Sequence, residues 1–204
     1  MPALKGREAV RAADLEQTYT FVLLLQGGNP LEHLDALFEA GCDDAVFGRR
    51  NGVYFAEFDR EAADFPEAVE TAIQQVERAV PALSVVRVEP DELVNGSAIA
   101  ERMGRTRESI RLLVEHRRGP GDFPPPVTWV ASKHPLWRWS LVAQWFADRL
   151  GESTETTTRS AFLAACNAAL EVRNYTPRLS QPKEREVVRR IVAETPGIGG
   201  SRRR

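Results

Sequence analysis

The sequence predicts an α+β fold made of two small domains followed by short helices. The chain has 204 residues, of which 43% are hydrophobic and 27% charged, which is ordinary globular usage. Short β-rich runs alternate with helical stretches up to about residue 90, and the sequence after residue 90 predicts mainly helices. The net charge changes sign at the same place: residues 1–94 carry −10, whereas residues 95–150 and 151–204 each carry +4. Such a change separates a part that phosphate repels from parts that phosphate attracts.

The acidic part, residues 19–90, contains four β-rich runs and two helices in the order βαββαβ. The expected strands are residues 19–25, 44–48, 53–58 and 83–88. Asn51-Gly52 separates the second run from the third, and this dipeptide between β-rich runs is a strong hairpin signal. We therefore expect these two strands to form a hairpin.

Each helix of this part has a clear start and end. Asn29 and Pro30 open the first, which places Leu31, Leu34, Leu37 and Phe38 on one face, and Gly41 ends it. Asp64 caps the second, Pro66 lies in its first turn, and Pro81 ends it after apolar residues at helical spacing, Val69, Ala72, Ile73, Val76 and Val80. The order resembles the ferredoxin-like sandwich, in which both helices cover one face of an antiparallel sheet. We expect the open face or a sheet edge to form a homodimer.

A small-molecule effector of this domain is an alternative to simple dimerisation. Residues 26–29 (QGGN) join a strand to a helix start, where free amides favour anions, although two glycines are also needed merely to turn the chain. His33 falls within a predicted helix, and the carboxylates Asp43, Asp44, Glu57 and Asp59 have no evident base or nucleophile beside them. These carboxylates are expected to be solvated, and we expect no enzyme activity.

Cysteine usage and hydropathy narrow the class of protein further. Cys42 and Cys166 stand alone, without a CxxC motif or a histidine at metal-ligand spacing, so we expect free thiols, no metal and no cofactor. No apolar run reaches the roughly 18 uncharged residues of a membrane span, and residues 1–16 have no hydrophobic signal core. These features predict a cytoplasmic protein without membrane partners.

The basic segment, residues 95–150, begins with two short helices around a glycine. Residues 97–104 form the first, and Thr106 is the expected cap of the second. Gly104 suits the turn, and the small Ala100 lets the second helix cross close by. A shared core is expected from Ile99, Met103, Ile110 and Leu113. This spacing is typical of a helix-turn-helix.

The continuation makes the pattern more specific. Phe123, Pro124, Pro126 and Val127 precede Trp137, Arg138, Ser140, Val142 and Trp145. These residues resemble the winged helix-turn-helix of the MerR, excisionase and phage regulatory protein group, which runs from FPxPV through a β-wing to WRxSDVxxWL. Leu141 departs from that pattern, where the group often has Asp. We expect residues 128–130 and 136–139 to pair as the wing, with residues 131–135 at its tip and Ser140 capping the last helix. Phe123, Trp137 or Trp139, and Trp145 would close the core.

The resemblance implies binding to double-stranded DNA. Helix N-terminal residues reach base edges in the major groove, and the arginine fork matches guanine O6 and N7. The expected base-reading residues are Arg105, Thr106, Arg107, Ser109 and Arg111. The expected backbone contacts are Arg117, Arg118, Lys133, His134 and Arg138. We predict a sequence-specific transcription regulator that acts as a dimer on two half-sites.

Two other functions remain open at this point. An excisionase-like recombination accessory factor would share the module, and a protein-interaction adaptor would have lost the DNA contacts. The remaining chain is predicted as a flexible N-terminus, residues 1–18, C-terminal helices within 151–196, chiefly 161–172 and 184–193, and a disordered basic tail, residues 197–204. These helices could extend a dimer interface or brace the basic module.

Overall fold

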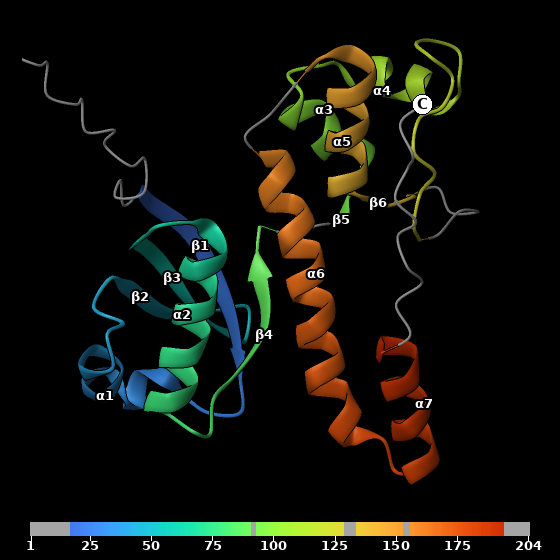
Figure 1. Ribbon diagram of the computed structural model, residues 1–204. Coiled ribbons are helices and arrows are strands. Elements are labelled where there is room, and N and C mark those ends of the chain that lie inside the picture. The colour runs from blue at the N-terminus through green and yellow to red at the C-terminus, as the bar shows by residue number, and fades with distance from the viewer. Residues whose placement is uncertain (1–16, 91–92, 129–133, 153–155, 194–204) are drawn as a thin grey trace, which may run out of the picture.

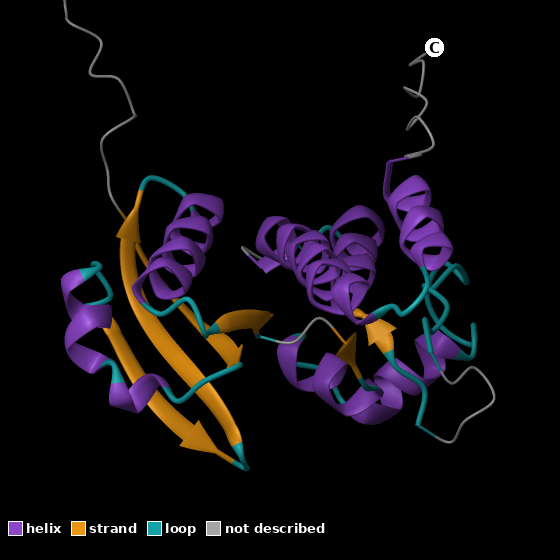
Figure 2. Cartoon of the chain, turned by 90° about the horizontal axis from the view of Figure 1, so that it is seen from below, coloured by secondary structure: helices purple, strands orange, loops and turns teal. Residues whose placement is uncertain are grey.

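The computed structural model of the chain describes residues 17–90, 93–128, 134–152 and 156–193 (Figure 1). It confirms the α+β class: a four-stranded antiparallel sheet stands beside a group of helices (Figure 2). The predicted flexible N-terminus lies outside the described residues up to residue 16, and residues 17 and 18 belong to a strand. The predicted disordered tail, residues 197–204, also lies outside them.

The sheet contains β1 (Gln17–Gln26), β2 (Ala45–Arg50), β3 (Val53–Ala62) and β4 (Ser84–Glu89), in the order β2-β3-β1-β4. Every neighbouring pair is antiparallel, and Phe21 of β1 lies opposite Phe58 of β3. The predicted hairpin turn is confirmed, since Asn51 and Gly52 both have positive φ, 51° and 83°. Both residue types tolerate this backbone region, which the tight hairpin requires.

Two helices pack on one face of the sheet (Figure 1). α2 (Phe65–Ala79) starts as predicted, with the Asp64 Oδ1 accepting the amide of Glu67 at 2.9 Å. The first helix was predicted as continuous, and that prediction is wrong. A 3-10 turn, η1 (Pro30–Glu32), and α1 (Leu34–Glu39) are separated at His33, whose φ of −131° is not helical.

The predicted apolar face of this segment does not form as a whole. Leu37 is fully buried, but Leu31, Leu34 and Phe38 are exposed, so only one of the four residues reaches the core. The core itself forms between the sheet and α2, where Phe21 and Phe58 stack with ring centroids 5.4 Å apart.

The prediction that the Asp44 carboxylate is solvated is also wrong. This carboxylate accepts from Arg60 Nε at 2.7 Å, and the arginine side chain is only 7% exposed. The same guanidinium donates to the carbonyl of Gly41 and to Gln75. A buried arginine needs these acceptors, so Asp44 is a structural residue.

The second group comprises β5 (Leu93–Val94), α3 (Gly96–Arg102), α4 (Arg107–Val114), β6 (Trp137–Arg138) and α5 (Trp139–Leu150). Its core contains the predicted Ile99, Ile110, Leu113, Phe123 and Trp145 and both of the alternatives Trp137 and Trp139. It also contains residues that were not predicted as core, namely Val94, Ala100, Val142, Ala143 and Phe146. Met103 packs against this cluster and is only partly buried.

Part of the predicted wing, residues 129–133, lies outside the described residues, and among those described Thr128 pairs with Leu136 in an isolated bridge. β6 pairs with β5, a strand that the sequence pattern did not reveal. Trp139 was expected in the wing but starts α5, so Arg138 occupies the N-cap and Ser140 does not. The buried Trp139 turns into the core, which ends the strand at Arg138.

The C-terminal helices are α6 (Thr156–Tyr175) and α7 (Pro182–Ala193), joined by η2 (Thr176–Arg178). α6 runs beside β4 and adds Leu163 and Leu170 to the core of the sheet domain (Figure 1). None of the described helices combines the length and the apolar character that crossing a membrane requires.

Candidate nucleic-acid interface

The corner between α3 and α4 is held by two side-chain caps and one glycine. The Asn95 Oδ1 accepts the amide of Ala98 at 2.9 Å, and the Thr106 Oγ1 accepts the amide of Ser109 at 3.1 Å, as predicted for Thr106. Gly104 has a φ of 59° with open space around its missing Cβ, so the backbone angle alone explains the glycine. Together these features fix the angle between the helices.

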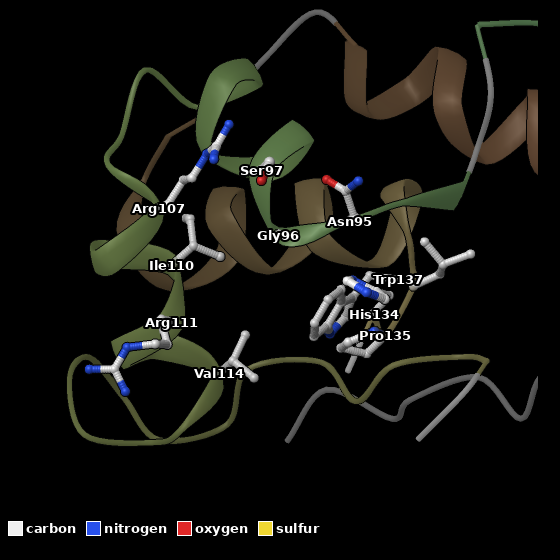
Figure 3. Close-up of a pocket in the computed structure, with 11 residues that line it drawn as sticks. Asn95, Gly96, Ser97, Arg107, Ile110, Arg111, Val114, His134, Pro135 and Trp137 are labelled. Atoms are coloured by element: carbon white, nitrogen blue, oxygen red, sulfur yellow. The ribbon is translucent and has the colours of Figure 1, made fainter. Parts of the chain in front are cut away.

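Arg107 and Arg111 lie one turn apart on the outer side of α4 and point into solvent (Figure 3). α4 itself lies at the end of the molecule remote from the sheet (Figure 1). The acidic domain therefore leaves this surface uncovered. Thr106 is also exposed, and Ser109 is half-buried.

The two arginines differ in what they contact. Arg111 donates to Glu108 at 2.6 Å and to Glu115 at 2.5 Å, and these carboxylates raise its pKa. The hydrogen bond from Arg111 lowers the pKa of Glu108 in turn. Arg107 has no ion-pair partner among the described residues. Within the described part of the chain, the Arg107 guanidinium is therefore available to an anion, whereas Arg111 must exchange partners before it can bind one.

Arg105, also predicted to contact DNA, is less exposed than Arg107 and Arg111 and has intramolecular partners. Its side chain is 25% exposed and forms an ion pair with Glu152. Its guanidinium also lies 5.3 Å from the ring centroid of Phe146. These contacts brace the start of α4 against the end of α5, so the structure separates Arg105 from the exposed pair on α4.

A groove of about 490 Å³ runs between α4, the start of α3 and the wing (Figure 3). Its lining includes both α4 arginines, Ile110, Val114, Asn95, Ser97, His134 and Pro135. His134 was predicted as a wing contact and is exposed there. Asn95, Ser97 and Pro135 were not predicted, because only the pairing of β5 with β6 brings residue 95 beside residues 134–137.

Aromatic side chains support the wing. Trp137 Nε1 donates to the carbonyl of Pro124 at 3.0 Å, and Trp145 Nε1 donates to the Asp122 carboxylate at 2.8 Å. The latter bond, helped by Arg149, lowers the pKa of Asp122. Phe123 lies between the two indoles, with its ring centroid 5.0 Å from that of Trp145. The segment between α4 and the wing is thereby tied to the core.

The remaining predicted contacts are spread around this groove. Arg117 and Arg118 are exposed in the turn after α4, and Arg117 lies 3.5 Å from a Glu115 carboxylate oxygen. Arg138 is half-buried in β6, where its backbone pairs with Leu93. Lys133 lies outside the described residues.

Comparisons of the chain with protein-family models, with curated protein sequences and with solved structures found no match. The resemblance to the MerR and excisionase group therefore stays a prediction from the residues. Function has to be argued from the geometry of α3, α4 and the wing.

Proposed function

We propose that the chain binds double-stranded DNA through a winged helix-turn-helix formed by residues 93–150, next to a ferredoxin-like domain formed by residues 19–90. One observation carries the proposal: Arg107 and Arg111 project from the solvent side of the capped helix α4, beside a groove that residues 134–137 also line. Helix-turn-helix proteins place the N-terminal residues of such a helix against base edges.

In the proposed complex α4 enters the major groove and the wing follows the neighbouring phosphate backbone. Arg107 then reads guanine with both ends of its guanidinium, and Thr106 contacts phosphate or base beside it. Contacts with the DNA backbone come from Arg117, Arg118, Lys133, His134 and Arg138. A dimer of such modules would read two half-sites, which is the usual arrangement of a transcription regulator.

A protein-interaction adaptor is the second candidate, favoured by a specific observation. Glu108 and Glu115 flank Arg111 on the α4 surface. Phosphate repels carboxylates, whereas a protein partner of mixed charge can pair with both signs. Loss or retention of DNA binding separates the two candidates, and the following two variants test the first.

Arg107→Ala is expected to weaken binding to the preferred duplex by about 1–3 kcal/mol and to relax the preference at one base position. The reason is that a bidentate contact to guanine is lost, while most phosphate contacts remain. The measurement is selection of bound sequences from a random duplex pool, followed by titration of the selected duplex. Arg78→Ala, an exposed change on α2, is the matched control. Equal weakening on all sequences would contradict base reading by Arg107.

Glu108→Gln is expected to strengthen DNA binding severalfold at low salt, because it removes a charge that phosphate repels and weakens the ion pairing of Arg111. Fluorescence anisotropy with one labelled duplex at fixed salt measures this effect. Glu70→Gln on α2 should leave the affinity unchanged. Weaker duplex binding by the Glu108 variant would contradict this prediction, because it would mean that the carboxylate accepts from a donor on the DNA.

A further inference from the structure

The two edge strands of the four-stranded sheet, β4 and β2, have different surroundings. The β4 edge is closed by α6, whose Asn167 accepts the amide of Val88 at 2.8 Å and donates to the Val88 carbonyl at 2.9 Å. Arg173 and Asn174 of the same helix donate to the carbonyl of Val85. β2 forms the other edge, and no strand of the described residues pairs with its outer side. An open edge presents backbone donors and acceptors to another strand.

The charges along this open edge are self-complementary. Asp43 is exposed just before β2, and Arg49 and Arg50 are exposed at its end. Arg49 lies over the ring of Tyr54 at 5.2 Å, which orders its guanidinium without neutralising the charge. A second copy of β2 running antiparallel would bring opposite charges together at both ends, as an isologous two-fold contact requires.

Exposed apolar side chains mark the same edge. Val46, at the middle of the charged stretch, is 67% exposed, and Phe38 of the neighbouring α1 is 65% exposed. α1 lies on the β2 side of the sheet (Figure 1). These exposed apolar side chains, beside an edge strand that lacks a partner on its outer side among the described residues, form a surface that association with another chain would bury.

We propose that a second copy of this chain pairs with β2, so that the two sheets become one continuous sheet across a two-fold axis. The register with Val46 opposite Val46 of the second copy also brings Asp43, in the turn just before β2, near Arg49, twice in each dimer. Asp44 takes no part, since its carboxylate is bound to Arg60. The dimer contact goes beyond DNA binding and does not depend on it.

Two opposite single charge reversals test the contact in the full chain. Asp43→Arg and Arg49→Glu each place like charges together at both ends of the homodimer, so each should weaken dimerisation at least about tenfold. A mixture of the two variants restores opposite charges at both ends. Its heterodimer should therefore form with about the affinity of the unsubstituted chain. Arg78→Glu on the helix layer is the control and should leave dimerisation unchanged.

Sedimentation equilibrium over a range of concentrations measures these affinities, and thermal unfolding checks that each variant is folded. The double variant Asp43→Arg, Arg49→Glu should dimerise like the unsubstituted chain, which guards against a defect from the lost Tyr54 contact. A chain that stays monomeric throughout the range would overturn the proposal. A dimer that the single reversals leave intact, or one that mixing fails to rescue, would equally overturn it.

Discussion

Replacing Phe146 with alanine is expected to lower the free energy of unfolding of the α3–α5 module by about 3–5 kcal/mol. The side chain is fully buried, and its ring centroid lies 5.2 Å from that of Trp145 and 6.3 Å from that of Phe123. Its loss leaves a cavity at the centre of the aromatic cluster and removes the surface against which Arg105 rests. The helix that we propose for DNA recognition would lose its support.

Urea unfolding followed by tryptophan fluorescence measures this effect cleanly, because all four tryptophans of the chain lie between residues 129 and 145. Leu141→Ala, on the exposed side of the same helix, is the matched control and should change stability by less than about 0.5 kcal/mol. An unchanged midpoint for the Phe146 variant would mean that the aromatic cluster does not hold the module together.

Asn167→Ala is expected to destabilise the sheet domain by roughly 2–6 kcal/mol, since it leaves two buried backbone groups of Val88 without partners and each costs about 1–3 kcal/mol. The amide is only 4% exposed, so water cannot readily replace it. Edge strand β4 should then exchange its amide hydrogens faster than β1 and β3. Hydrogen exchange combined with urea unfolding measures both effects.

The matched control for Asn167 is Glu171→Ala, one turn further along α6. Its carboxylate is 59% exposed and lies 3.7 Å from Arg87, so its loss should be nearly neutral. If Asn167→Ala were as mild as this control, α6 would not be the element that closes the β4 edge.

The parts of the fold that could be predicted from sequence are those with local causes. Asn51-Gly52 and the caps Asp64 and Thr106 act within four residues of themselves, so their spacing alone indicates the turn or helix start. The apolar positions of α3 and α4 follow helical periodicity and were therefore identified as core.

The errors arose where distant segments decide the outcome. Asp44 is ion-paired because the fold brings Arg60 of β3 beside it, and the start of α5 depends on Trp139 entering the core. In the candidate site, Arg105 could not be separated from Arg107 by sequence, because only the folded chain brings Glu152 and Phe146 to the former.

The salt dependence of duplex binding by the full chain tests the central claim most directly. Counterion release makes the logarithm of the binding constant fall linearly with the logarithm of salt concentration, by about 0.9 for each phosphate contact. We predict such a fall for the unsubstituted chain, and a shallower one when Arg107, Arg117 and Arg118 are replaced together by alanine. Absence of duplex binding at low salt, or a slope that these three substitutions leave unchanged, would contradict the proposal that the α4 surface binds DNA.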